Sequence, residues 1–265
     1  MKNHITIFGA GNLTRSILNG IYLSNASHNI DVIDVDKKKR IGVEKYGVSF
    51  KSTLTDSISK SDFILLLVKP KDYIKLIKSI DRFINKKTII ISFMAGITIK
   101  QIQDNFSAKI NIIRAMTNLT ISNGEAIIFY YDKILTKRNT VKAEGFFETF
   151  SKIKKCKSED QLDKLTALYG SGPAYYVFFN DIITKTFIEL GFNRRDSISY
   201  AENLISETSN LLKDSDSSRS LIKAIASKGG TTEAALLRLK NDRVQEKISR
   251  AIKSAYDKSK NIMKK

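Results

Sequence analysis

Cysteine, histidine, proline and tryptophan are scarce in this chain of 265 residues, which contains one Cys, two His, two Pro and no Trp. The single cysteine, Cys156, excludes an internal disulfide and a cysteine-based metal site. Neither histidine has a second ligand within sequence reach, so we expect no metal. With only 13 glycines beside the two prolines, the composition also argues against long disordered stretches.

Long apolar runs are missing as well. The longest ones, residues 63–68 and 88–93, have the length of strands and are too short to span a bilayer. Residues 1–4 lead directly into a short strand, which is not typical of a secretory signal. We therefore expect a soluble, cytoplasmic protein without a membrane partner.

The net charge is the most unusual feature of the composition. The chain has 45 Lys and Arg against 27 Asp and Glu, for a formal charge of +18. Such a balance occurs in nucleic-acid-binding proteins, but here the basic residues are scattered, apart from the run at residues 37–40. We interpret the charge as solvated surface charge and expect no nucleic-acid partner. The alternative, nucleic-acid binding through the +18 charge, predicts salt-sensitive retention on DNA.

Two halves of the chain differ in pattern. Short runs rich in Val, Ile, Leu and Phe alternate with amphipathic stretches up to about residue 151, which predicts a doubly wound α/β domain with a largely parallel sheet. After residue 157 the strand-like runs disappear and long amphipathic stretches follow. We place an α/β domain at residues 1–157 and an all-α domain at residues 158–265. The predicted strands are residues 5–8, 30–33, 63–68, 88–93, 110–114 and 126–130.

The first predicted strand ends in a glycine turn that leads into a helix. Gly9, Ala10, Gly11, Asn12 and Leu13 form this turn, in which the first glycine allows a tight bend and the second lets the backbone approach a pyrophosphate. The segment predicts a dinucleotide-binding Rossmann domain, although Thr14 fills the third small position of the fingerprint.

The cues for the type of dinucleotide conflict. Asp34 follows Gly11 by 23 residues and closes the second strand, where an acid usually bonds a ribose 2′-hydroxyl and favours NADH. The adjacent run Lys37–Arg40 has the charge to hold the 2′-phosphate of NADPH. We expect NADPH or NADH as the cofactor and activity with both.

Further candidate residues follow the later strands and begin two helices. Ligands bind beyond the carboxyl ends of strands in open α/β sheets, and glycine and hydroxyl residues at a helix start leave backbone N–H groups free for a carboxylate. The strand ends supply Val68, Lys69, Pro70, Ala95, Gly96 and Asn118, and the helix starts supply Ser171, Gly172, Gly229, Gly230, Thr231 and Thr232.

In their order along nearly the whole chain, these segments resemble the pyrroline-5-carboxylate reductase family. The segments are Gly9–Leu13, Val68–Pro70, Ala95–Ile97, Arg114–Asn118, Gly170–Tyr175 and Gly229–Thr232, of which the last two are the most specific. The resemblance implies a Rossmann domain followed by a helical dimerisation domain, and a homodimer that assembles further into a larger oligomer such as a decamer.

The resemblance also implies a small-molecule substrate and a reaction. A hydride is transferred from the nicotinamide to the C=N carbon of 1-pyrroline-5-carboxylate, which gives L-proline. Backbone N–H groups near Gly230 and Thr231 would hold the substrate carboxylate, and Thr232 would direct its hydroxyl at the ring nitrogen. By the same resemblance, the strand-end residues and Gly9–Leu13 bind the cofactor.

Some positions depart from the family pattern. Thr117 and Thr120 stand where the family usually has prolines, and Lys228 also replaces a proline. Asp181 and Lys185 stand where the family has an acidic pattern, so Lys185 reverses one charge. Two alternatives to the reductase therefore stay open: a dehydrogenase of the same fold acting on a hydroxy acid, and a reductase-like binding protein that has lost activity.

Overall fold

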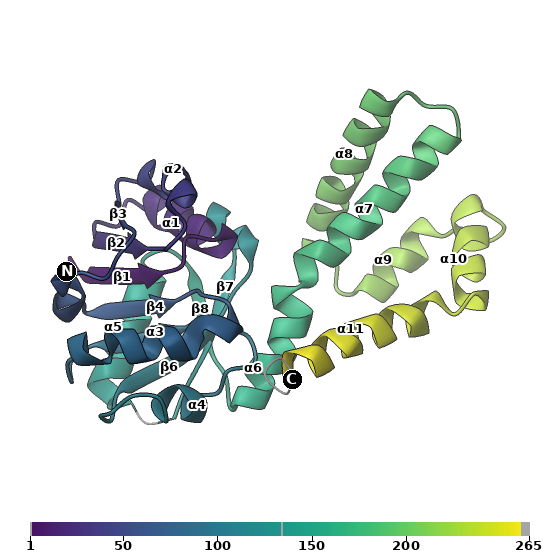
Figure 1. Ribbon diagram of the computed structural model, residues 1–265. Helices are drawn as coiled ribbons and strands as arrows, with labels where there is room; N and C mark the ends of the chain where they lie inside the picture. The colour runs from purple at the N-terminus through teal and green to yellow at the C-terminus, as the bar shows by residue number, and fades with distance from the viewer. Residues whose placement is uncertain (1, 134, 261–265) are drawn as a thin grey trace. The chain divides into compact units, whose positions relative to one another are not determined.

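The chain, as a computed structural model, is described over residues 2–133 and 135–260 and divides into two compact units (Figure 1). The first unit comprises residues 1–171 together with the end of the chain from Ala255, and the second comprises residues 172–254. Residues 1, 134 and 261–265, which the predicted domain ranges include, lie outside the described residues.

An eight-stranded sheet forms the centre of the first unit, in the order β3-β2-β1-β4-β5-β6-β7-β8. The pair β6–β7 is antiparallel and the other neighbouring pairs are parallel, which confirms the predicted largely parallel sheet. The strand order reverses between β1 and β4, where open α/β sheets bind ligands. The strands are β1 His4–Phe8, β2 Asn29–Ile33, β3 Ser49–Lys51, β4 Phe63–Leu66, β5 Ile89–Ser92, β6 Asn111–Met116, β7 Ile127–Asp132 and β8 Lys152–Lys155.

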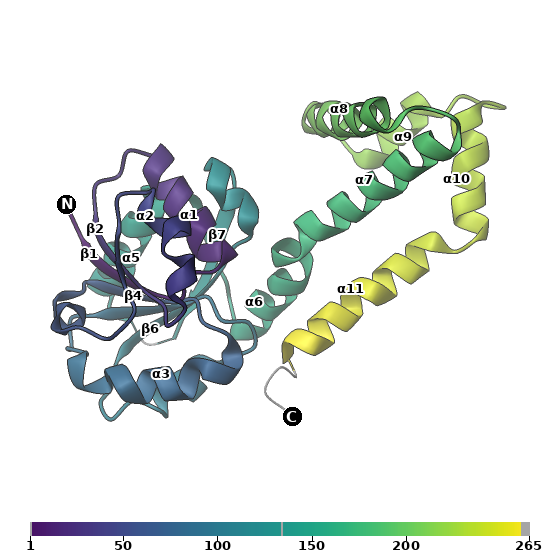
Figure 2. The ribbon, with the colours of Figure 1, turned by 45° about the horizontal axis from the view of Figure 1, so that its top comes forward.

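The apolar strands form because both faces of the sheet are covered. In β4, Phe63 and Leu65 face a core that includes α1 and α5, whereas Ile64 and Leu66 face a core that includes α3 and α4. All four side chains are fully buried. Figure 2 shows α1 and α3 on opposite sides of the sheet. The helices of this unit are α1 Asn12–Leu23, α2 Ile41–Glu44, α3 Tyr73–Ile80, α4 Ile99–Gln103, α5 Lys137–Glu148 and α6 Glu159–Leu165.

Two strands of the sheet were not among those predicted. β3 lies at one edge of the sheet and β8 at the other, and both are short. The sequence of β8 is Lys-Ile-Lys-Lys, so it has one apolar residue, Ile153, which packs on the core. Edge strands pair on one side only and need little apolar surface, which is why a search for apolar runs misses them.

Helix α1 packs closely on the 3₁₀ turn η5, Leu119–Asn123. A Cβ atom added to Gly20 would lie 2.6 Å from the Ile121 carbonyl oxygen. Next to it, the Asn19 amide donates a hydrogen bond of 2.7 Å to the Ser122 carbonyl. Glycine is unfavourable inside a helix, by about 1 kcal/mol relative to alanine, so its presence here reflects the close approach of the turn.

The second unit is entirely helical over its described residues, as predicted for the C-terminal part. Its helices are α7 Gly172–Glu189, α8 Arg194–Lys213, α9 Ser218–Ile225, α10 Thr231–Asn241 and the start of α11 Val244–Lys260. The rings of Phe187, Phe192 and Tyr200 hold the junction of α7 and α8, with centroid distances of 5.4 to 6.2 Å. No helix within the described ranges is long and apolar enough to cross a membrane.

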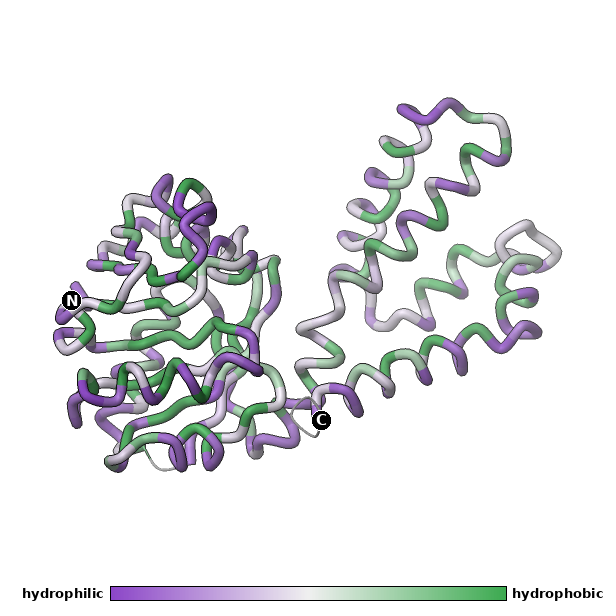
Figure 3. Tube along the Cα trace, in the orientation of Figure 1, coloured by the Kyte–Doolittle hydropathy of each residue, from purple (hydrophilic) through white to green (hydrophobic). Residues whose placement is uncertain are grey.

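Helix α7 exposes an apolar surface. None of its residues is buried within the described chain, and Tyr176, Val177 and Phe178 are 66%, 67% and 62% exposed. Figure 3 shows hydrophobic residues along the length of this helix. Such an exposed apolar surface is typical of a protein–protein interface.

The last turn of α11 belongs to the first unit, where it binds α6. Asp160 accepts hydrogen bonds from the Tyr256 hydroxyl at 2.6 Å and from the Lys260 ammonium at 2.7 Å. Lys164 of α6 forms a third contact with the same carboxylate, at 2.7 Å. The chain therefore leaves the first unit after Ser171 and returns to it at α11.

Candidate active site

The glycine turn connects β1 to α1 at the carboxyl edge of the sheet. Gly9 has a φ of +100°, and a Cβ atom there would lie 2.5 Å from the Leu67 carbonyl oxygen, so only glycine fits. The fully buried Thr14 donates its hydroxyl to the Gly9 carbonyl. The threonine that departs from the glycine fingerprint thus closes the turn with a hydrogen bond.

The second glycine of the turn faces open space. A Cβ atom on Gly11 would meet no atom of the described chain within 4 Å. Gly11 is also the N-cap of α1, and no described side chain caps this helix. An uncapped helix start beside free space is the arrangement that binds a pyrophosphate, because the first N–H groups have no partner and the helix dipole is positive there.

Asp34 is fixed against the same turn. Its carboxylate accepts hydrogen bonds from the Ala10 amide at 2.7 Å, the Asp36 amide at 2.9 Å and the Lys39 ammonium at 2.9 Å. Burial alone would raise the pKa of Asp34, but these three donors outweigh it and hold the pKa below its usual value. Asp34 is therefore ionised at neutral pH and lies directly against the glycine turn.

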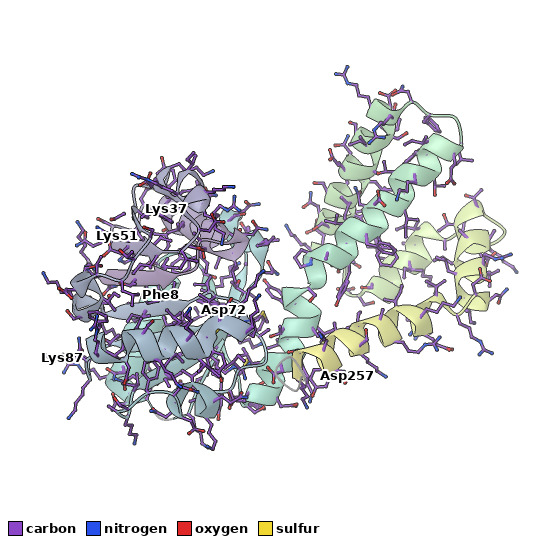
Figure 4. All side chains as sticks on the ribbon, viewed as in Figure 1. Phe8, Lys37, Lys51, Asp72, Lys87 and Asp257 are labelled. Carbon is purple, nitrogen blue, oxygen red and sulfur yellow. The ribbon has the colours of Figure 1, made fainter. Side chains whose placement is uncertain are left out.

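The basic run beside Asp34 is already partly neutralised. Lys39 pairs with Asp34, and Arg40 pairs with Glu44 at 2.8 Å. Lys37 and Lys38 have no ion pair within the described ranges. Figure 4 places Lys37 beside α2. Only two of the four predicted phosphate-binding cations thus remain without a counter-ion in the described chain.

The ends of β4 and β5 carry the next predicted residues. β4 stops at Leu66, so Lys69 lies in the following loop and precedes a 3₁₀ turn that begins at Pro70. Val68 packs on the core between the sheet and α3. After β5, Ala95 is followed by Gly96, which has a left-handed φ of +69°. This conformation lets the chain turn away from the sheet.

A pocket of about 230 Å³ lies beyond the carboxyl ends of β5 and β6. It unites Leu13 and Ala95 from the predicted cofactor residues with Ser171 from the predicted substrate residues. The other lining residues are Phe93, Met94, Arg114, Ala115, Met116, Thr117, Leu162, Thr166 and Gly170. A wider hollow of about 470 Å³ is lined by residues 60–62 and 85–87, which precede β4 and β5. Because ligands bind at carboxyl ends, we assign the site to the smaller pocket.

Asn118 uses its side chain within the protein. Its amide nitrogen donates to the Tyr169 carbonyl at 2.9 Å, and its amide oxygen accepts from the Thr120 backbone at 2.9 Å and hydroxyl at 2.6 Å. Thr120, which stands where the family usually has a proline, thus stabilises the loop by hydrogen bonds. These hydrogen bonds hold the loop that follows β6 in place against Tyr169.

Arg114 is a buried charge that lines the pocket. We predicted no role for it from the sequence. It is 1% exposed, and its two terminal nitrogens contact Glu159 at 3.0 Å and Asp163 at 2.7 Å on α6. An arginine inside an otherwise apolar strand is the signal that points to such a network, because buried charges need partners. The pairs connect β6 to α6. The π-helical turn η6, Thr166–Gly170, continues α6 and is capped by Ser171.

The second glycine segment lies in the helical unit and begins α10. Gly229 has a φ of +77°, and its amide donates to the Glu233 carboxylate at 2.7 Å. The Gly230 amide donates to the Ser227 carbonyl at 3.0 Å. Gly230 is the N-cap of α10 without a side-chain cap in the described chain, so Thr231 and Thr232 form its open first turn. Gly172, the remaining predicted substrate residue of this unit, begins α7.

Two lysines that depart from the family pattern lie on the surface of the helical unit. Lys185 is 67% exposed and pairs with Asp181 one turn earlier, at 2.6 Å. Lys228 is exposed in the loop before α10. The charge that Lys185 reverses is thus balanced on the same face of α7.

Together, the glycine turn, the acid at the end of β2 and the pocket at the strand ends define a nicotinamide-dinucleotide-dependent oxidoreductase. A family model described as NADP oxidoreductase, coenzyme F420-dependent, matches residues 4–96, and one described as pyrroline-5-carboxylate reductase dimerisation matches residues 159–262. The chain is 30% identical to pyrroline-5-carboxylate reductase 2 of Bacillus subtilis, over 97% of this chain and 94% of the relative. The protein belongs to the pyrroline-5-carboxylate reductase family.

Solved structures share this fold over nearly the whole chain. The pyrroline-5-carboxylate reductase of Streptococcus pyogenes superposes with a TM-score of 0.87 at 24% identity, covering 98% of this chain and 99% of that one. The Plasmodium falciparum enzyme, solved with NADP bound, gives a TM-score of 0.86 at 21% identity and covers 97% of both chains. These likenesses confirm the predicted order of a Rossmann domain followed by a helical domain.

Proposed function

We propose that the protein reduces 1-pyrroline-5-carboxylate to L-proline with NADPH or NADH, the last step of proline biosynthesis. The observation that carries this proposal is the likeness to a pyrroline-5-carboxylate reductase over 97% of the chain, which covers both units. The dinucleotide turn and the pocket beside it supply the site at which such a reaction takes place.

The residues present fit the cofactor. Free space at Gly11, the uncapped start of α1 and the fixed carboxylate of Asp34 match a pyrophosphate and a ribose. Val68, Lys69, Pro70, Ala95, Gly96 and Asn118 complete the proposed cofactor site with Gly9, Ala10, Asn12 and Leu13. When bound, the reduced nicotinamide supplies the hydride.

The proposed work of the protein is to hold the substrate. Ser171, Gly172, Gly229 and Gly230 form its surroundings, and the open first turn of α10 binds the carboxylate through backbone N–H groups. Thr232 directs its hydroxyl at the ring nitrogen. The C=N carbon receives the hydride while the nitrogen of the protonated iminium keeps its proton, so a neutral hydroxyl acts by positioning rather than as a strong acid.

Replacing Thr232 by alanine tests this role. We expect the Thr232→Ala variant to lose turnover by about a hundredfold, because the substrate is no longer aligned, with little change in cofactor affinity. Thr232→Ser keeps the hydroxyl and is the matched control, with turnover close to that of the wild type. Steady-state rates and cofactor titrations measure both effects. Unchanged turnover in the alanine variant would remove Thr232 from the mechanism.

Asp34 is proposed to set the balance between the two cofactors. Its ionised carboxylate repels a 2′-phosphate and engages Lys39, so both NADH and NADPH are used. We expect Asp34→Asn, which keeps the shape and frees Lys39, to raise the ratio of kcat/KM for NADPH over NADH by about tenfold. Asp36→Asn makes the same change of charge two residues away and should leave the ratio within about twofold. Equal effects of the two substitutions would contradict the assignment.

Oligomerisation is supported by the dimerisation family model and by the apolar surface of α7. We propose that residues 158–265 form the dimerisation and substrate domain of a homodimer, and that dimers assemble into a decamer. Sedimentation of the purified protein tests both steps. A cytoplasmic location and the absence of nucleic-acid and membrane partners stay predictions.

The decisive assay follows NAD(P)H oxidation with pyrroline-5-carboxylate and, in parallel, NAD(P)⁺ reduction with small hydroxy acids. Turnover on the cyclic imine alone is the expected result. Turnover on hydroxy acids alone would identify a dehydrogenase of the same fold. Cofactor binding without turnover on any substrate would identify a reductase-like binding protein.

A further inference from the structure

Two residues that line the pocket beyond β5 and β6 each have a buried polar atom without a hydrogen-bond partner in the described chain. These atoms are the Thr117 hydroxyl oxygen and the Nε of Arg114. Thr117 is 6% exposed and Arg114 is 1% exposed. A buried polar group that stays unpaired costs free energy, so two such groups lining one pocket indicate a ligand that supplies their partners.

The position of the pocket indicates which part of the cofactor reaches it. Asp34 and Gly11, the proposed anchors of the ribose and the pyrophosphate, follow the ends of β2 and β1. β5 and β6 lie on the other side of the reversal in strand order, and β6 is four strands from β2, or roughly 19 Å at the usual spacing. A dinucleotide that starts at Asp34 and crosses the reversal ends with its nicotinamide at this pocket.

The local charge favours a neutral ligand group. Arg114 is paired with both Glu159 and Asp163, so the three side chains together carry one negative charge. A carboxylate placed here would meet that excess of negative charge. A carboxamide is neutral, and its oxygen and NH₂ group offer both an acceptor and a donor.

We propose that the Thr117 hydroxyl is a hydrogen-bond partner of the nicotinamide carboxamide, accepting from its NH₂ group and so fixing the orientation of the ring. The inference rests on the proposed function, because it takes a nicotinamide dinucleotide as the ligand. The proposal gives a role to the hydroxyl of Thr117. The proline that the family usually has at this position could not make this hydrogen bond, because it has no hydroxyl. Thr117 is then a residue that selects one face of the ring for hydride transfer.

Binding measurements on two variants test this role. Thr117→Val removes the hydroxyl at nearly constant shape, and Thr117→Ser retains it. We expect Thr117→Val to weaken NADH binding roughly three- to tenfold, the range of one hydrogen bond, and to leave ADP-ribose binding unchanged, because ADP-ribose has no nicotinamide. Thr117→Ser should bind NADH like the wild type. The acetylpyridine analogue of NADH has no amide NH₂ group, so the wild type and Thr117→Val should bind it equally.

Other outcomes overturn the proposal. Equal losses for NADH and ADP-ribose would show that Thr117 only supports the fold, and no loss for NADH would show that it does not contact the carboxamide. A raised KM for pyrroline-5-carboxylate with unchanged NADH affinity would place the hydroxyl on the substrate instead. Because these titrations need no turnover, a wild type that binds NADH without reducing the imine would refute the proposed function and still decide the role of Thr117. A wild type that binds no dinucleotide would refute both.

Discussion

Replacing Gly11 by alanine is expected to weaken NAD(P)H binding by about a hundredfold while leaving the thermal unfolding temperature unchanged. The new methyl group would meet no described atom of the protein within 4 Å, and Gly11 has an extended backbone that alanine adopts easily, with φ −79° and ψ −172°. The methyl group would occupy the space through which a pyrophosphate approaches the start of α1. Cofactor titration and thermal unfolding on the same preparation measure the two effects.

The matched control is Gly9→Ala, two residues earlier in the same turn. Its Cβ atom would lie 2.5 Å from the Leu67 carbonyl oxygen, and its φ of +100° strains any other residue. We expect this variant to lose about 2–4 kcal/mol of folding free energy. The two glycines thus separate binding from folding. If both variants lost stability equally, or if Gly11→Ala bound the cofactor normally, the pyrophosphate would not lie at Gly11.

The Arg114→Met substitution is expected to destabilise the protein by about 3–5 kcal/mol, because it leaves two poorly solvated carboxylates without the arginine that they share. The side chains of Glu159 and Asp163 are 25% and 12% exposed, so water compensates only partly. Methionine fills most of the volume of the arginine and limits the cavity. Chemical unfolding measures the loss.

Two further variants identify charge as the cause. Arg238→Met removes one partner of an exposed pair, in which Arg238 is 79% exposed, and should change stability by less than about 1 kcal/mol. Adding Glu159→Gln and Asp163→Asn to Arg114→Met should recover part of the loss, because no unpaired charge remains. A loss below about 1 kcal/mol in Arg114→Met would mean that water already solvates the network.

The central strands could be predicted from sequence because burial on both faces requires continuous apolar runs. The fully buried strand β4 is the clearest example. The edge strands β3 and β8 carry too few apolar residues to be recognised, since the sheet contacts them on one side only. The helical half could be predicted from its amphipathic spacing and its lack of strand-like runs.

The candidate cofactor residues could be named from the sequence, but the contacts between them could not. Asp34 and the lysine run looked like opposing cues, because their spacing in sequence says nothing of their contact in space. In the fold, Lys39 binds Asp34, so one cue partly neutralises the other. Arg114 is recognisable as a charge within an apolar strand, but the unpaired atoms of Arg114 and Thr117 could not be predicted, because an unpaired atom is a property of packing and not of residue type.

Gly20 has a consequence for cofactor affinity that reaches along α1. The contact between Gly20 and the Ile121 carbonyl sets how closely the helix lies on η5, and hence the direction in which its axis points. The open helix start at Gly11 lies about 13 Å away along that axis, at 1.5 Å per residue. A bulkier side chain at Gly20 would tilt the helix and turn its positive end away from the pyrophosphate. A contact two and a half turns along α1 thus sets the direction of the dipole that we propose binds the cofactor.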